Sequence, residues 1–139
     1  MAAVSVRAAQ QMLTENSATW VQELQLRVEF VAPDRAVLRL PFSDNLVRIG
    51  GMICGQALMS AADTAMVIAL AGSFGGFKPV TTVSQNVTFM RPISGKDTLV
   101  EARIVRLGRT LAFGEILLRA DGDERPAAHA TATYAILAG

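Results

Sequence analysis

The chain has 139 residues, 51% of them hydrophobic and 18% charged, with a formal net charge of +1. The length fits one domain, which we expect to extend over residues 1–139. A charge so close to zero gives no overall field to attract nucleic acid or an anionic membrane, so neither is expected as a partner. The apolar surplus favours burial in a subunit interface, so we expect an oligomer.

Cysteine and histidine are almost absent from the sequence. A single cysteine, Cys54, excludes an internal disulfide, and a single histidine, His129, excludes a histidine-based metal cluster. We therefore expect no metal site. Polar residues such as Arg7 and Glu15 fall where a secretory signal would need an unbroken apolar stretch, so a cytoplasmic location is expected.

The N-terminal half predicts helix, then a hairpin, then a second helix. Residues 4–24 have apolar residues near helical spacing, which makes residues 1–23 a helical extension of the domain. Residues 24–32 and 35–42 alternate apolar and polar side chains on either side of a Pro-Asp turn, which is typical of a hairpin. Residues 43–52 predict an irregular loop, and residues 54–72 predict a helix that glycines end.

The C-terminal half is rich in valine, threonine, isoleucine and phenylalanine, and it predicts four strands at residues 80–90, 98–107, 110–120 and 127–137. Their short connections indicate an antiparallel meander. The helix at 54–72 is apolar almost all round, so it should be buried, and a sheet that curls around it could cover it. These elements predict an α+β fold in which a curved antiparallel sheet wraps a long central helix.

Asp63 is the only charged residue between Arg48 and Lys78. Burying an ionised carboxylate costs several kcal/mol unless it is paired or hydrogen-bonded. Three kinds of carboxylate would explain a lone charge in this apolar stretch: a functional one, a capping or interface one, and one embedded in a membrane. Asp63 lies too far into the helix to cap it, and the polar groups of residues 49–71 disfavour a membrane span.

Three stretches, in this order and spacing, resemble the PaaI-like acyl-CoA thioesterases of the hotdog fold. They are GQALMSAADTAM at residues 55–66, TVSQNVTFMRP at residues 82–92 and LGRTLAFGEI at residues 107–116. The resemblance implies the fold described above. It also implies a homodimer, and a dimer of dimers, in which the base and the oxyanion donor of one site come from different subunits.

The same resemblance assigns catalytic roles. It implies that Asp63 is the general base or nucleophile, that Gly55 presents its backbone N–H to the developing oxyanion, and that Thr82 holds the nucleophilic water. The family's His-Gly-Gly motif falls on Cys54, Gly55 and Gln56. The family's loop asparagine falls on Arg48 without gaps, or on Asn45 if the loop differs in length.

Coenzyme A is expected as part of the substrate, with no separate cofactor. The turn at Gly108, Arg109 and Thr110 is similar to the family turn that binds the nucleotide, and Arg91 and Arg106 are further candidates for its phosphates. An acyl group would fit near three methionines that recur every seven residues, which are Met52, Met59 and Met66, although core or dimer packing is the commoner role of such a stripe.

The expected function is hydrolysis of an aryl or medium-chain acyl-CoA through Asp63. The alternative is a non-catalytic hotdog protein that binds acyl-CoA or another small ligand. An acyl-thioester dehydratase of the same fold is disfavoured, because that chemistry needs a histidine beside the acid and the central helix has none.

Overall fold

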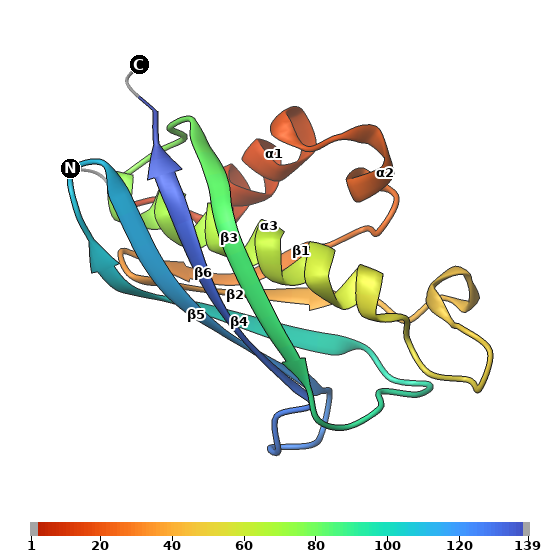
Figure 1. Cartoon of the computed structure of the whole chain (residues 1–139). Coiled ribbons are helices and arrows are strands. Elements are labelled where there is room, and N and C mark those ends of the chain that lie inside the picture. Colours follow the sequence, from red (N-terminus) through yellow and green to blue (C-terminus); the bar gives the residue numbers. More distant parts are fainter. Residues whose placement is uncertain (1–2, 138–139) are drawn as a thin grey trace.

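The computed structural model describes residues 3–137, which form one six-stranded sheet, a long helix against it and two shorter N-terminal helices (Figure 1). The elements are α1 (Val6–Asn16), α2 (Thr19–Gln22), β1 (Arg27–Ala32), β2 (Arg35–Leu40), the 3-10 turn η1 (Asp44–Leu46), α3 (Gly55–Phe74), β3 (Val80–Phe89), β4 (Thr98–Leu107), β5 (Leu111–Ala120) and β6 (Ala128–Ile136). The strand order is β1-β2-β4-β5-β6-β3, and every neighbouring pair is antiparallel.

The predicted meander of four late strands is wrong for its first strand. β3 lies at the sheet edge beside β6, and β4 pairs instead with β2, where Leu38 lies opposite Val100 (Figure 1). Buried Ile93 helps to hold the connection from β3 to β4, and its carbonyl accepts a hydrogen bond of 2.9 Å from the N–H of Ile53. Alternating side chains show which face a strand buries but not which strand it pairs with, so the sequence pattern could not exclude this order.

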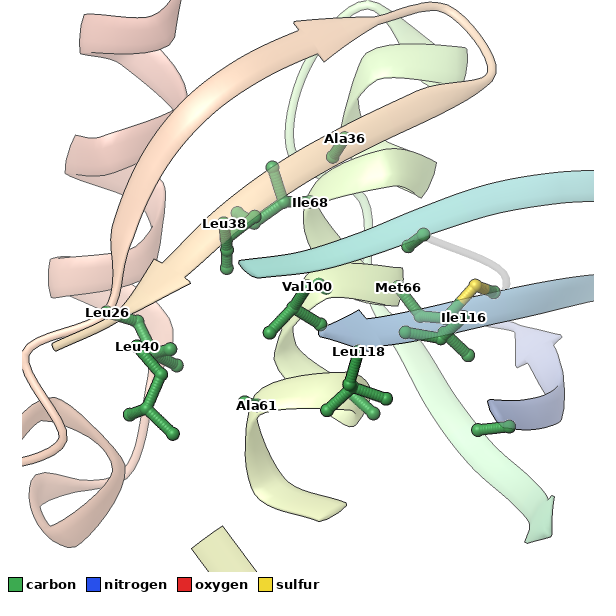
Figure 2. Close-up of a cluster of buried hydrophobic side chains, with 14 of the residues drawn as sticks. Leu26, Ala36, Leu38, Leu40, Ala61, Met66, Ile68, Val100, Ile116 and Leu118 are labelled. Carbon is green, nitrogen blue, oxygen red and sulfur yellow. The ribbon is translucent and has the colours of Figure 1, made fainter. Parts of the chain in front are cut away.

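α3 lies across the inner face of the curved sheet. Figure 2 shows Val100, Ile116 and Leu118 of the sheet gathered around side chains of α3 such as Met66 and Ile68. Gly114 of β5 allows this close approach, because a β-carbon there would collide with the sulfur of Met66. A curved antiparallel sheet wrapped on one long helix is the hotdog fold, as the resemblance implied.

One stripe of α3 is left uncovered by the sheet. α3 has the length and mean hydropathy of a membrane-crossing helix, but eleven of its residues are buried inside the fold. Gln56 and Met59 are exposed, and Asp63 and Val67 are half-buried along the same helix face. The expectation of a helix covered nearly all round is therefore wrong for this stripe, which lies on the side of the free sheet edge at β3.

The N-terminal extension forms two helices, α1 and α2, separated at Ser17 and Ala18. The Gln10 side chain ties α1 to the start of β1: its Nε2 donates to the carbonyl of Leu26 at 3.1 Å, and its Oε1 accepts from the N–H of Val28 at 2.7 Å. Phe30 was expected to continue the buried alternation, yet a bulge between Val28 and Phe30 turns it to the outside.

Candidate active site

Asp63 lies half-buried on α3, where two hydroxyl groups converge on the same carboxylate oxygen. Thr82 Oγ1 of β3 donates to Asp63 Oδ1 at 2.7 Å. The hydroxyl of Tyr134, on β6, also contacts Oδ1 and lies 2.9 Å from the backbone carbonyl of Asp63. Among the described residues none donates a hydrogen bond to Oδ2. One carboxylate oxygen is therefore fixed in place, and the other is available to a water or a substrate.

Tyr134 is held as a neutral donor. Its side chain is only 1% exposed, and burial raises the pKa of Tyr134 well above its ordinary value. The neighbouring Asp63 carboxylate raises that pKa further, because a phenolate beside it would be repelled. The phenol therefore keeps its proton at any physiological pH and can orient Asp63.

A bulge in β3 aims Thr82 at Asp63. The pairing of β3 with β6 slips between Thr82 and Ser84, so the unpaired residue is Val83. Because of that extra residue, Thr82 shares the helix-facing side of the sheet with its partner Tyr134. Strict alternation along residues 80–90 predicts Thr82 on one face with Ser84, Asn86 and Thr88, and that prediction is wrong, since those three lie on the opposite, outer face.

Asp63 lines a pocket of about 350 Å³ between α3 and the N-terminal helices. The remaining wall comes from the segment that leads into β3. Most of the lining is apolar, and among residues 3–137 Asp63 is the one charged residue that contributes to it. The three methionines expected here do not line it: Met52 lies at the other end of α3, Met59 is exposed, and Met66 is buried in the core.

Gly55 lies at a second pocket, of about 400 Å³, at the N-terminus of α3. It is the first residue of the helix, and no backbone carbonyl accepts its N–H among the described residues. Phe89 of β3 packs against it, and a β-carbon on Gly55 would lie 3.2 Å from the ring. The first amides of a helix are unpaired donors at the positive end of its dipole, so this N–H suits a developing negative charge.

Gly55 and Asp63 do not meet within one chain. Eight residues of α-helix separate them, which corresponds to about 12 Å along the axis. They also line different pockets. A thioester carbonyl in contact with both groups is therefore impossible in a single copy of the chain.

The residues expected beside Gly55 do not all lie near it in the structure. Arg48 lines the Gly55 pocket together with Arg91. Asn45 is exposed in η1 and lines none of the pockets described here. Cys54 is the half-buried N-cap of α3, and its N–H donates to the carbonyl of Leu46 at 2.8 Å, whereas Gln56 is exposed on the uncovered stripe. Of the two candidates for the family's loop asparagine, Arg48 is the one near Gly55.

The arginines expected at the coenzyme A phosphates fall into two groups. Arg106 and Arg109 lie near the turn between β4 and β5, where Gly108 donates to the carbonyl of Leu111 at 2.8 Å and the carbonyl of Thr110 accepts from Ile136. This turn lies by the start of β3, whereas Arg91 follows the end of β3. Ten residues of strand place the two groups about 30 Å apart. One copy of the chain does not bring them together.

His129 has a partner on the outer face of the sheet. Its Nε2 lies 2.9 Å from Oε2 of Glu115. It belongs to the outward side of β6 and Tyr134 to the inward side, so the sheet separates this histidine from Asp63. Nothing near His129 in the sequence forms a catalytic triad, which favours a satisfied surface histidine over a base, and its position beside Glu115 agrees with that interpretation.

Tyr134 is the site residue that the sequence reasoning missed. A usable signal exists, because it is the chain's only tyrosine and falls in phase with Ala128, Ala130 and Ala132. A long side chain with a polar tip at an inward position among alanines needs a hydrogen-bond partner. The lone acid of the central helix is the natural candidate.

Comparison with known proteins decides the family. Residues 50–127, more than half of the chain, match the family model described as the Thioesterase superfamily. The chain belongs to the thioesterase superfamily. The matched region includes Gly55, Asp63, Thr82 and the turn at Gly108, but it ends before Tyr134.

Individual proteins resemble this thioesterase-superfamily chain over most of its length. A protein of Thermoplasma volcanium named "putative esterase" is 29% identical over 115 residues, which cover 83% of this chain and 85% of that protein. The crystal structure of a "putative thioesterase" from Silicibacter sp. has a TM-score of 0.84 and 29% identity, and the match covers 96% of this chain and 92% of that one. The phenylacetic acid degradation protein PaaI of Thermus thermophilus, solved as a mutant, has a TM-score of 0.76 and 25% identity, with 86% and 100% covered.

Proposed function

We propose that this protein hydrolyses the thioester of an acyl-coenzyme A, with Asp63 as general base or nucleophile. The observation that carries the proposal is the geometry of that carboxylate. Thr82 and the Tyr134 hydroxyl fix Oδ1, and Oδ2 faces no donor among the described residues. A carboxylate held in one orientation at the wall of an apolar pocket is suited to act on a bound ester carbonyl.

The proposed reaction is hydrolysis of the thioester C–S bond, which consumes one water and releases an acid and a thiol. In the general-base route, Asp63 Oδ2 takes a proton from a water whose oxygen attacks the thioester carbonyl carbon. The carbonyl oxygen becomes an oxyanion that the Gly55 N–H stabilises. The intermediate then collapses, the C–S bond breaks, and the thiolate leaves and takes up the proton. In the nucleophilic route, Oδ2 attacks the carbonyl carbon first, the C–S bond breaks and the thiolate leaves. Water then hydrolyses the resulting mixed anhydride, which releases the acid and regenerates the Asp63 carboxylate.

We infer that two copies of the chain complete each site. The uncovered stripe of α3 and the free edge of β3 lie side by side, and both carry exposed apolar side chains, such as Met59 and Val83. A two-fold axis at this surface would set the two α3 helices antiparallel. The Gly55 of one copy would then approach the Asp63 of the other, which the distance along one helix prevents within a single chain. A dimer of dimers remains a further proposal.

The same arrangement offers a site for coenzyme A. Antiparallel pairing of β3 with its copy would bring Arg91 of one chain toward Arg106 and Arg109 of the other. Three arginines would then surround the nucleotide phosphates as charge-assisted donors. The name of the Thermus PaaI protein refers to phenylacetic acid degradation, which supports an aryl acyl group; a medium-chain acyl group is the other substrate class that we propose.

The alternative function is binding of acyl-CoA without turnover. The observation that favours it is the loop beside Gly55, where Cys54 and Arg48 stand in the positions of the family's histidine and asparagine. Hydrolysis and binding differ in one measurable step, which is release of free coenzyme A.

A thioester panel with detection of free coenzyme A tests the proposal. Wild type should hydrolyse hexanoyl- or phenylacetyl-CoA, and Asp63→Asn should lose at least about a hundredfold in kcat while keeping its fold and its oligomeric state. Circular dichroism and size-exclusion chromatography check the last two. An Asp63→Asn protein that hydrolyses at the wild-type rate would make Asp63 structural. Tight binding of acyl-CoA by an inactive wild type would establish the alternative.

A further inference from the structure

The pocket beside Asp63 is walled largely by the α1–α2 segment, residues 6–22. Six of its fourteen lining residues come from this segment, five come from α3, and three come from the stretch that enters β3. The family match begins only at residue 50, so this wall lies outside it. The N-terminal extension is therefore part of the pocket that the candidate catalytic carboxylate faces.

The lining is apolar on all three sides. Met12 and Val21 contribute from the N-terminal segment, Val67 and Ile68 from α3, and Phe77 and Val80 from the approach to β3. A volume of about 350 Å³ is within the usual range for a small-molecule site. Such a lining favours a hydrocarbon or aryl group, which gains from leaving water and asks for no hydrogen bonds.

The charge of the pocket is equally selective. Of the described residues that line it, Asp63 is the one with a charge, and Asn16, Ser17 and Thr64 are polar without a charge. Lys78 follows the lining residue Phe77 in the sequence, but its ammonium group lies 5.0 Å above the ring of Phe74 and does not line the pocket. An acyl group that ends in a carboxylate would enter without a counter-ion and near a like charge, and both effects oppose its burial.

The rim of this wall is lightly packed. α2 has only four residues, and none of them is buried. Trp20 is 57% exposed at the same rim. α1, in contrast, is anchored through buried Ala9 and Leu13 and through the Gln10 contacts to β1. The end of the pocket formed by α2 is thus the part whose size a substitution can change without disturbing the core.

We propose that this pocket holds the acyl group of the substrate and that the α1–α2 segment determines specificity. The pocket admits an uncharged, apolar acyl group, aromatic or of medium length, and it excludes one with a terminal carboxylate. The inference rests on the proposed function, and it adds the acyl class and the element that sets it.

Hexanoyl-CoA and adipoyl-CoA, which differ only in a terminal carboxylate, test the charge argument. Wild type should show a kcat/KM for hexanoyl-CoA at least about tenfold higher than for adipoyl-CoA. Asn16→Lys places a cation in the pocket at the C-terminal end of α1, where a positive charge suits the helix dipole. It should narrow or reverse the preference. Equal rates for the two substrates in wild type, or an unchanged ratio in Asn16→Lys, would overturn the proposal.

Val21→Trp tests the wall, with Glu23→Trp as the matched control that adds the same side chain at an exposed position outside the pocket. Val21→Trp should lower kcat/KM progressively more from acetyl- to hexanoyl- to decanoyl-CoA, reaching roughly tenfold or more for the longest. Glu23→Trp should leave the chain-length profile of wild type. A loss that is equal for all three substrates would contradict the assignment of this wall.

A binding measurement separates failure of the pocket assignment from failure of the proposed hydrolysis. S-hexyl-CoA and its carboxyl-terminated counterpart are thioethers that cannot be hydrolysed, so calorimetry on wild type measures binding without turnover. The two ligands share the coenzyme A portion, so the difference in their affinity reports the acyl pocket. Preference for S-hexyl-CoA in a protein without turnover would keep the acyl pocket and overturn hydrolysis. Equal affinity for the two thioethers in an enzyme that does hydrolyse acyl-CoA would keep the proposed hydrolysis and overturn the acyl pocket.

Discussion

The hydroxyl of Thr82 lies 2.7 Å from Oδ1 of Asp63, so the edge strand β3 and the central helix α3 are joined at the candidate catalytic carboxylate. The contact depends on the bulge at Val83, which turns Thr82 toward the helix. Any change that shifts the edge strand β3 should therefore alter the orientation of the Asp63 carboxylate.

Thr82→Val removes the donor and keeps the shape of the side chain. We expect kcat to fall by about tenfold, because one hydrogen bond that orients the carboxylate is lost. Thr82→Ser keeps the hydroxyl and should stay within a few-fold of wild type. Steady-state kinetics measure both variants, and an active Thr82→Val beside an impaired Thr82→Ser would show that the methyl group, rather than the hydroxyl, is what counts.

Tyr134→Phe removes the second donor to Asp63 while the buried ring is kept. The free energy of unfolding should fall by about 1 kcal/mol, the net value of a typical hydrogen bond. The kcat should fall as well, with KM nearly unchanged, because the hydroxyl contacts the carboxylate and not the pocket. Urea unfolding and steady-state kinetics measure the two effects. A fully active Tyr134→Phe would mean that Thr82 alone suffices to orient Asp63.

Gly55→Pro deletes a single N–H at the first position of α3. Proline is well tolerated at that position of a helix, and Cys54 before it already has the extended backbone that a following proline requires, with φ −69° and ψ 149°. Gly55→Ala is the matched control, since it adds a β-carbon of the same kind near Phe89 and keeps the N–H. If this amide stabilises the oxyanion, Gly55→Pro should lose about a hundredfold in kcat relative to Gly55→Ala. Similar rates for the two variants would remove the amide from the proposed site.

Stability at low pH should depend on the cluster around Arg39, which binds Glu29, Asp97 and Asp121. The backbone N–H of Phe42, and then Arg39, lower the pKa of Asp97 below its ordinary value. A lowered pKa means that the ionised carboxylate stabilises the fold above its unfolded-state pKa, and that this contribution is lost as the pH falls through the folded-state value.

The free energy of unfolding should therefore be nearly constant from neutral pH down to about pH 5 and should fall below about pH 4. Asp97→Asn should be less stable than wild type by about 1 to 2 kcal/mol at pH 7, and the difference should shrink in acid. Glu124→Gln, at an exposed carboxylate, serves as the control. Denaturant titrations at several pH values check this, and a difference that stays constant with pH would argue against Asp97.

The elements of this fold were predictable where one local pattern determines them. The apolar run at residues 54–72 and the alternating strands gave the helix and the sheet, and the isolated charge of Asp63 singled out the candidate catalytic residue. The family stretches then placed Gly55 and Thr82 by spacing alone. Each of these inferences needs only neighbours in the sequence.

Features that depend on contacts between distant segments could not be read in the same way. The pairing of β3 with β6, the contact of Tyr134 with Asp63 and the separation of Arg91 from Arg109 all follow from the strand order. The bulge at Val83 shifts every side chain on one side of it, and no local composition marks it. The N-terminal wall of the pocket likewise arises from the packing of α1 on β1 through Gln10.

The central claim is that Asp63 of one chain and Gly55 of another form one hydrolytic site. Co-expression of Asp63→Asn with Gly55→Pro tests it, because a mixed dimer would contain one site with both groups intact and one with neither. Each variant alone should retain only about a hundredth of the wild-type activity. A random equal mixture should recover about a quarter of the wild-type activity per site, since half of the dimers are mixed and half of their sites are intact. A mixture no more active than the single variants would contradict the claim.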